Sequence, residues 1–240
     1  ETTVTGLFCI ENRKFVFEGV DCRFKFVVLS YKKGGKTERF PAAFMRHDVA
    51  ELERFPQEGA IEISVPLVRR LAPDSLSVME FKNPLDVQIA EKMLKFPLLG
   101  ERLENVWNIS LMQEFNMTTD SHLFKTEPGP GRLPLYEGKV FHQFTSSWGM
   151  PKYWLDEAES RQALLGKTGD TGQILNYQCY RLAFRDIAAS TNERAMIMTI
   201  LPKRVFCPHT VSLENVNESS LSSSSRLFLL SVCNSYPIDY

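Results

Sequence analysis

The feature that most limits the fold is a pair of strand-like runs close together in the second half of the chain. Residues 177–187 and 194–201 are rich in aromatic, aliphatic and β-branched side chains, and only a short polar loop separates them. Such runs predict an antiparallel hairpin, because a connection this short joins neighbouring strands that run in opposite directions. The hairpin therefore favours antiparallel sheets over a parallel, doubly wound fold.

Strand-like and helix-like runs follow one another elsewhere without regular β–α–β alternation. The expected fold class is α+β, with mixed, mainly antiparallel sheets and several helices. Besides the hairpin, strands are expected at residues 4–10, 14–18, 23–31, 40–46, 106–115, 140–144 and 210–213. Helices are expected at residues 48–55, 64–71, 84–96, 156–165 and 221–240. The serine-rich stretch 214–225 is expected to be mobile.

The charge balance restricts the possible partners. The chain has 28 basic and 29 acidic residues and a net charge of −1, so any site for a polyanion must be a local patch. No apolar run approaches the roughly 20 residues of a membrane span, and no membrane association is expected. The five cysteines are scattered without a CxxC pair, which favours reduced, buried thiols in a cytoplasmic protein.

The ends of the sequence indicate a piece of a longer protein. The chain starts Glu-Thr-Thr-Val, without an initiator methionine or a basic leader, and its last residues stop in mid-pattern. The strongest internal break is the Pro/Gly-rich loop at 125–134. The motifs GxxxxGK[ST], HExxH and GxSxG do not occur. An independent enzyme such as a nuclease is one possible function, but the sequence has no convincing Asp…Glu-x-Lys set on a predicted strand.

Two arginines stand at the mouth of the hairpin, Arg185 near the end of the first run and Arg194 at the start of the second. On a strand, Arg185 shares a face with Arg181, and the opposite face is expected to be core. Like charges that close repel unless something negative lies between them or comes to meet them. Two explanations stay open: Asp186 and Glu193 brace the turn from within, or an external anion binds there.

Several long motifs resemble one family, the adenine-N6 DNA methyltransferases of single-chain restriction–modification enzymes and of bacterial BREX-type phage-defence systems. The motifs are, in order, "GLFCIENRKFVFEGVDCRFKFVVLSY", "FNMTTDSHLFKTE", "LPLYEGKVFHQFTSSW", "PKYWLDEAESRQALL", "YRLAFRDIAASTNERAMIMTILP" and "LLSVCNSYPIDY". The later ones resemble the TaqI-like C-terminal specificity domain. The resemblance implies that residues 1–96 are the tail of a methyltransferase domain and that residues 97–240 are a target-recognition domain.

The resemblance also implies what this chain does not do alone. Such methylases bind S-adenosylmethionine through an FxGxG-type loop and position adenine with an Asn-Pro-Pro-aromatic tetrapeptide. Neither motif is present, since Asn83-Pro84-Leu85-Asp86 lacks the second proline and the aromatic residue. We therefore expect an inactive fragment without a cofactor, whose parent is an adenine-specific DNA methyltransferase using S-adenosylmethionine, with or without endonuclease activity. The expected partners are double-stranded DNA and the parent's catalytic domain.

Two stretches carry the candidate DNA-binding residues. Arginine forks suit phosphates and guanine edges, glutamine suits adenine, and short hydroxyl or amide side chains suit either kind of contact. The candidates are Lys139, Gln143, Thr145, Ser146, Ser147, Arg185, Ser190, Thr191, Asn192 and Arg194. No catalytic residue and no metal ligand is expected.

Two alternatives stay open beside this hypothesis. Tyr136 and Trp148 either stack on an unpaired base or pack in the core, and for Trp148 the core is the favoured interpretation. The whole chain, with its near-neutral charge, is alternatively a docking module of a phage-defence complex that touches DNA little. Neither interpretation gives the DNA sequence that would be recognised.

Overall fold

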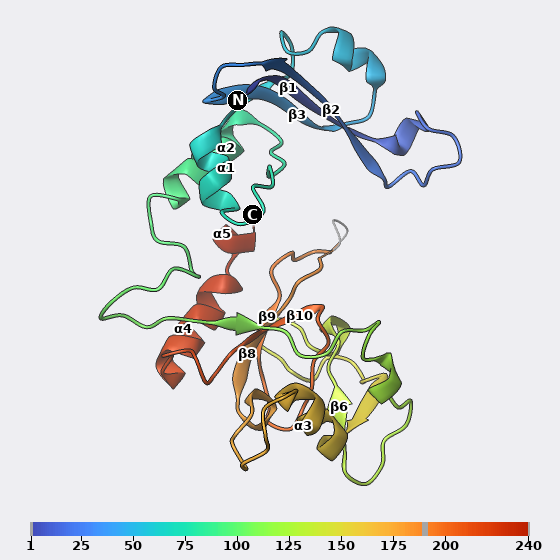
Figure 1. The fold of residues 1–240 in the computed structure, drawn as a ribbon, viewed down its shortest axis with the longest axis vertical. Coiled ribbons are helices and arrows are strands. Elements are labelled where there is room, and N and C mark those ends of the chain that lie inside the picture. The colour runs from blue at the N-terminus through green and yellow to red at the C-terminus, as the bar shows by residue number, and fades with distance from the viewer. Residues whose placement is uncertain (1, 189–191, 240) are drawn as a thin grey trace. The chain divides into compact units, whose positions relative to one another are not determined.

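The computed structural model describes residues 2–188 and 192–239 (Figure 1). The chain divides into two compact units, Glu1–Leu98 and Leu99–Tyr240, which we call the N-terminal unit and the C-terminal unit. The division falls close to the predicted boundary at 96/97, while the functional labels given to the two parts remain predictions. Candidate residues Ser190 and Thr191 lie outside the described residues.

A four-stranded mixed sheet forms the N-terminal unit, in the order β2-β1-β3-β4. The central strands β1 and β3 are parallel, and the two outer pairs are antiparallel. The strands are β1 (Thr2–Glu11), β2 (Lys25–Lys33), β3 (Arg39–Arg46) and β4 (Ile61–Ser64), and the helices are α1 (Val65–Leu71) and α2 (Pro84–Met93). One side of the sheet shares a core with the two helices through residues such as Phe40, Ile63, Leu67 and Val87.

The helix starts of this unit follow from local side-chain chemistry. The Ser64 hydroxyl accepts a hydrogen bond from the Leu67 amide, which caps α1. Asn83 and Asp86 form a reciprocal capping box at the start of α2, with Pro84 at its first position. Asp48 likewise caps Val49–Glu53, a 3₁₀ helix that is shorter than the helix predicted at 48–55. These starts were predicted correctly because a cap acts over only three residues.

The predicted strand at 14–18 is wrong. The Asn12 side chain is buried and donates to the carbonyls of Phe17 and Val20 at 3.0 and 2.9 Å, while its oxygen accepts from the Phe17 amide at 2.9 Å. These bonds close a compact loop between β1 and β2. Phe15, in the left-handed region at φ 52°, ends the short 3₁₀ turn Asn12–Lys14. Several backbone groups that a strand would pair, such as the amide and carbonyl of Phe17, are therefore hydrogen-bonded within the loop.

The C-terminal unit is built around a four-stranded antiparallel sheet in the order β5-β10-β8-β9. Its elements are β5 (Leu111–Met112), β6 (Arg132–Leu135), β7 (Tyr153–Asp156), α3 (Glu157–Leu165), β8 (Arg181–Arg185), β9 (Met198–Leu201), β10 (Val211–Glu214), α4 (Ser223–Cys233) and α5 (Tyr236–Asp239). The pair β6–β7 forms a small second sheet. β8 and β9 confirm the predicted hairpin, with shorter strands. In contrast, the predicted strand at 106–115 shrinks to β5.

Both faces of β8 are covered, so the expectation that only one face is core is wrong. Leu182 packs with Leu229 and Leu230 of α4 on one face. Ala183 packs on the other face with Phe141 and other buried residues from coil segments and neighbouring strands. Both faces of this central strand are therefore buried between two layers of the C-terminal unit.

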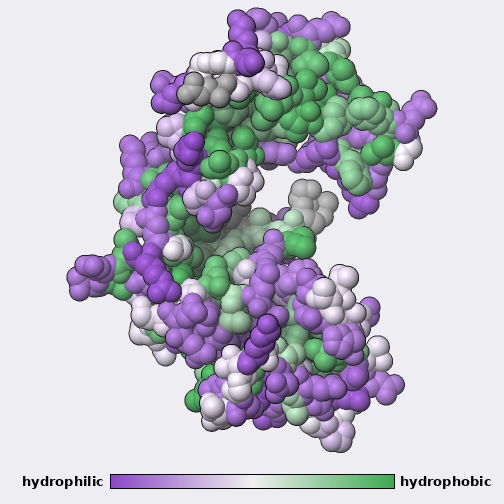
Figure 2. Space-filling model, viewed as in Figure 1, coloured by the Kyte–Doolittle hydropathy of each residue, from purple (hydrophilic) through white to green (hydrophobic). Residues whose placement is uncertain are grey.

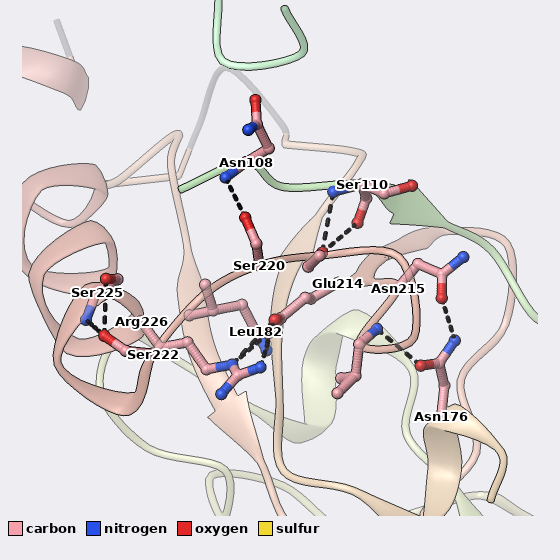
Figure 3. A network of polar contacts seen from close by, with 12 residues as sticks. Asn108, Ser110, Asn176, Leu182, Glu214, Asn215, Ser220, Ser222, Ser225 and Arg226 are labelled. Atoms are coloured by element: carbon pink, nitrogen blue, oxygen red, sulfur yellow. Dashed lines mark hydrogen bonds and ion pairs between the residues drawn. The ribbon is translucent and has the colours of Figure 1, made fainter. Parts of the chain in front are cut away.

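The serine-rich segment 214–225, predicted to be mobile, is instead extensively hydrogen-bonded (Figure 3). The Ser220 hydroxyl accepts from the Asn108 amide at 2.8 Å, and the Ser219 hydroxyl accepts from the Ser110 amide at 3.0 Å. Figure 3 also shows the buried Glu214 carboxylate, which accepts from Arg226 of α4 at 2.8 and 2.9 Å. The partners lie more than a hundred residues away for the serines, beyond the reach of any local pattern.

The fold class is α+β with mostly antiparallel sheets, as the sequence predicted. No helix within the described residues has both the length and the apolar character needed to cross a lipid bilayer.

Candidate functional site

The two candidate stretches of the sequence meet at one cavity in the C-terminal unit. The cavity has a volume of about 270 Å³. One loop, residues 138–149, lines it together with the end of β8. Residues of the stretch 192–197, in the described part of a second connection that we call loop 186–197, also line it. The lining residues are Lys139, His142, Trp148, Arg185, Asn192, Glu193, Arg194 and Ile197. Four of the predicted DNA-binding residues are therefore neighbours: Lys139, Arg185, Asn192 and Arg194.

Loop 138–149 begins with a 3₁₀ turn, Gly138–Val140, and then closes on itself through backbone hydrogen bonds, so the predicted strand 140–144 is not formed. The carbonyl of Val140 accepts hydrogen bonds from the amides of Trp148 and Gly149, both at 2.9 Å. His142 and Thr145 exchange two backbone hydrogen bonds at 2.9 and 3.1 Å across a tight turn. Gly149 is required for this closure, because a Cβ there would lie 2.7 Å from the Lys139 carbonyl oxygen. The alternation of side chains expected for a strand therefore does not apply here.

Two bonds fasten loop 138–149 to the start of β9. The Gln143 Nε2 donates to the Met196 carbonyl at 2.8 Å, and the Phe144 amide donates to the Met198 carbonyl at 3.3 Å. Gln143 was predicted to read adenine through a bidentate contact. In the structure its amide nitrogen instead joins the two loops, so reading a base would require this bond to break.

Arg185 is a half-buried cation that forms no ion pair with a carboxylate of the described residues. Its Nη2 donates to the Phe141 carbonyl, its guanidinium lies 5.7 Å from the Phe141 ring centroid, and its Nε has no hydrogen-bond partner among the described residues. Burial lowers the pKa of the Arg185 guanidinium. The side chain crosses Gly138 and borders a second cavity of about 260 Å³. No described carboxylate forms an ion pair with it, so the internal brace proposed for Asp186 does not hold for Arg185.

Arg194 has a different support. Its Nη2 donates to the carbonyl of Asn234, the residue that ends α4, at 2.7 Å, and its guanidinium lies 4.1 Å from the Tyr236 ring centroid. A cation at the C-terminal end of a helix also offsets the negative end of the helix dipole. Arg194 therefore ties loop 186–197 to the C-terminal helices while it lines the cavity.

Charges of both signs line the cavity. Lys139 forms an ion pair with Glu137 at 3.1 Å, and Glu193 is itself a lining residue. Among the described residues, Lys139, Arg185 and Arg194 are the cations that line the cavity, and Glu193 is the carboxylate that lines it. An anion would find its least compensated partner at Arg185, because the charge of Lys139 is already offset.

Trp148 is an exposed side chain and not the core residue that the sequence favoured. It is 67% exposed, and its ring centroid lies 4.8 Å from that of His142. Tyr136 is half-buried and packs against a core cluster, as its core interpretation predicted. Phe144, to which the sequence gave no role, is 60% exposed.

The remaining candidate DNA-binding residues differ in their position relative to the cavity. Thr145, Ser146 and Ser147 belong to loop 138–149 but are not among the residues that line the cavity. The Thr145 hydroxyl accepts from the Ser147 amide at 3.3 Å, so it supports the turn. Asn192 is exposed at the cavity and free of any described side-chain hydrogen bond.

Two larger hollows fit a DNA-binding site less well. One, of about 610 Å³, lies beside α3, where Arg161 and Glu157 already have the ionic partners Asp170 and Arg204 at 2.7 and 2.8 Å. The other, of about 770 Å³, is a surface hollow beside α1 in the N-terminal unit. Neither brings an unpaired buried charge and exposed aromatic rings together.

Comparison with models of known protein families gave no match, and comparison with curated proteins gave none either. The resemblance to DNA methyltransferases therefore rests on the order and length of the sequence motifs.

Proposed function

We propose that the C-terminal unit recognises double-stranded DNA through loops 138–149 and 186–197. The observation that carries the proposal is Arg185, a half-buried guanidinium that borders two cavities and has no described carboxylate as its partner. A charge buried in this way is costly unless an anion completes it, and a phosphate or a guanine edge matches its fork. Lys139, Arg194 and Asn192 add donors around the same cavity.

In this proposal the chain holds and reads DNA, and catalysis belongs elsewhere. A catalytic domain of the parent protein would transfer a methyl group from S-adenosylmethionine to the N6 of adenine. The sequence motifs that support this assignment flank the cavity, since "LPLYEGKVFHQFTSSW" contains loop 138–149 up to Trp148 and "YRLAFRDIAASTNERAMIMTILP" contains loop 186–197. Arg185 and Trp148 would then form the recognition surface, and the C-terminal unit alone would have no methyltransferase activity.

The test is selection from a pool of random duplexes. The 240-residue chain is incubated with the pool, bound duplexes are recovered, and the cycle is repeated before sequencing. We expect enrichment of one short sequence, which the Arg185→Ala variant either loses or relaxes at one position. The matched control is Lys167→Ala, which removes a positive charge from an exposed loop of the same unit. A wild-type chain that retains DNA without enriching any sequence would contradict a recognition role.

A second candidate function is docking, and a surface of the N-terminal unit favours it. Val27, Leu29 and Tyr31 of the edge strand β2 lie opposite Cys9, Leu7 and Val4 of β1, and all three are exposed. Figure 2 shows hydrophobic residues gathered over the strands of this unit. Exposed apolar edge strands tend to pair with another chain. The parent's catalytic domain is the partner we expect there.

The docking candidate has its own measurement. Replacing Leu29 by Lys introduces a charge on the exposed stripe without touching the C-terminal unit. We expect the wild-type chain to self-associate in sedimentation experiments and Leu29→Lys to remain monomeric. A monomeric wild type whose β2 amides exchange slowly with deuterium would argue against docking at this edge.

A further inference from the structure

A hollow of about 770 Å³ lies at one end of the sheet of the N-terminal unit. Residues 35–38, in the turn between β2 and β3, form one wall, and residues 64–66, where β4 passes into α1, form another. Arg39 at the start of β3 and Arg69 of α1 also line it. Sites for small molecules have volumes of roughly 300–1,000 Å³, so a compact ligand fits a hollow of this size.

The walls of the hollow are held by hydrogen bonds of the sheet and its turn. The Thr37 hydroxyl accepts from the Val4 amide at 2.9 Å and donates to the Thr2 carbonyl at 2.8 Å, which fastens the turn to β1. The Val65 amide donates to the Glu38 carbonyl at 2.9 Å and so joins the two walls. The hollow is therefore formed by the backbone before any ligand arrives, which lowers the cost of binding.

Positive charge dominates the lining of the hollow. Among the described residues, Lys36, Arg39 and Arg69 are its cations, and Glu38 is its carboxylate. Glu38 lies 3.9 Å from Lys36, and both side chains are at least 80% exposed, so water weakens this ion pair. No ion pair or side-chain hydrogen bond to a described residue involves Arg39 or Arg69. We call this site the basic hollow.

Other arginines of the N-terminal unit are treated differently by the fold. Four of them form ion pairs with carboxylates at 2.7–3.2 Å, namely Arg13, Arg23, Arg46 and Arg54. The whole chain has a net charge of −1, so a concentration of unpaired cations in one concave place is a local feature. Clefts lined by charge of one sign attract ligands of the opposite sign.

We propose that the basic hollow binds a small organic polyphosphate, with its phosphates on Lys36, Arg39 and Arg69 and its organic body against Val65 and Pro66. Guanidinium forks match phosphate oxygens in a bidentate manner. Three cations exceed one carboxylate by two charges, which favours a multiply charged anion over a single carboxylate. A duplex lays its phosphates along an extended surface, whereas a concave hollow encloses a compact ligand. The proposal involves no residue of the C-terminal unit and is independent of DNA recognition there.

The test titrates the 240-residue chain with ATP and with inorganic tripolyphosphate by isothermal titration calorimetry, without magnesium. We expect saturable binding of both and tighter binding of ATP, because only ATP has an organic body that can pack on Val65 and Pro66. The double variant Arg39→Ala/Arg69→Ala should weaken ATP binding by about 5- to 30-fold. Equal affinities of wild type for the two probes would contradict the role given to the apolar wall.

Glu38→Gln is the decisive second variant, because it should tighten ATP binding by about 2- to 5-fold, a gain that a damaged fold cannot produce. The change removes the carboxylate of the hollow and leaves the Glu38 carbonyl free to accept from Val65. The matched control is Lys92→Ala/Lys95→Ala, which also removes two positive charges from exposed positions of the N-terminal unit, outside the hollow. We expect this control to bind ATP as wild type does.

A short DNA duplex, titrated into the same proteins, separates the two sources of phosphate. We expect Arg39→Ala/Arg69→Ala to retain the duplex affinity of wild type. If the double variant weakens duplex binding and ATP does not bind, the phosphates are those of DNA and the small ligand is wrong. If ATP does not bind, or if the control weakens it as much as the double variant does, the inference fails. DNA recognition by the C-terminal unit would be untouched by that failure, because it is tested by Arg185→Ala.

Discussion

Arg181 and Arg185 stand at the two ends of strand β8 on the same face of the sheet, and the fold treats them in opposite ways. The Arg181 side chain is 0% exposed and forms an ion pair with the equally buried Glu114 at 3.1 Å. Its Nη2 also donates to the Val205 carbonyl at 2.8 Å. Arg185 is half-buried and borders two cavities. Within the described part of the chain, its guanidinium has the Phe141 carbonyl as hydrogen-bond acceptor and the Phe141 ring beside it, and no carboxylate.

The difference shows that residue type and strand position do not decide what a buried cation does. Arg181 has its anion inside the fold, because the Glu114 Oε2 accepts from Arg181 at 3.1 Å and also from the Cys207 amide at 2.8 Å. No described carboxylate takes that place at the other end of the strand. We infer that Arg181 serves stability and Arg185 serves binding, and four predictions test this division.

The largest expected effect is that of Arg181→Met on stability. The change leaves the Glu114 carboxylate buried without its cation, which should lower the free energy of unfolding by about 3–5 kcal/mol. All three tryptophans lie in the C-terminal unit, so urea unfolding followed by tryptophan fluorescence reports this unit alone. The double variant Arg181→Met/Glu114→Leu should recover most of the loss. A single variant as stable as wild type would show that the pair contributes little.

The second prediction is that the loss in Arg181→Met depends on pH. Burial already raises the pKa of Glu114, Arg181 offsets part of that rise, and without Arg181 the folded-state pKa goes higher still. A raised pKa contributes stability below the unfolded value of about 4.3, and this contribution disappears as pH rises through the folded value. The variant should therefore lie closer to wild type near pH 4 than near pH 7, and urea unfolding at the two pH values measures the difference. Glu114→Leu, measured in parallel, should lack this pH dependence.

The third prediction concerns Arg185→Ala, which should weaken binding but not folding. Removing one phosphate contact should flatten the slope of log affinity against log salt by about 0.9. Unfolding should change by less than about 1 kcal/mol, because the variant also removes a poorly solvated charge. Lys167→Ala is the control for loss of one positive charge. The slope is measured by fluorescence anisotropy over a series of salt concentrations. If wild type and Arg185→Ala have equal slopes, Arg185 makes no phosphate contact and its contrast with Arg181 fails.

The smallest expected effect is that of Arg194→Ala. This variant loses the hydrogen bond to the Asn234 carbonyl and the contact with Tyr236, so we expect a loss of about 1 kcal/mol in stability, measured by the same urea unfolding. Its salt slope should change less than that of Arg185→Ala. If Arg194→Ala flattens the slope as much as Arg185→Ala does, both arginines contact phosphate, as the sequence suggests.

Part of the candidate site could be predicted from the sequence, since the candidates Lys139, Arg185, Asn192 and Arg194 all line one cavity. The conformation of the first loop could not be predicted. Its residues 140–144 have the composition of a strand, but the Val140 carbonyl bonds to Trp148 and Gly149 instead of a neighbouring strand. In this closed loop Trp148 and Phe144 are exposed, although aromatic residues are usually buried.

The polar segment 214–225 gives the opposite lesson. Its composition is typical of mobile linkers, yet Ser219 and Ser220 bond to the backbone at residues 108–110 and Glu214 binds Arg226 (Figure 3). A polar side chain predicts flexibility only where nothing else in the fold supplies a partner. For Ser219 and Ser220 the partners are residues 108–110, near the start of the C-terminal unit.

The sequence by itself determined the features that depend on neighbours a few residues apart. These are the α+β class, the hairpin of β8 and β9, and the capped starts of α1, α2 and α3. Only the tertiary structure decided which arginine of β8 received a carboxylate and which aromatic residues remained exposed. The physical reason is range: capping and turn formation act within one or two turns of chain, whereas the cost of a buried charge is set by residues that folding brings from far away.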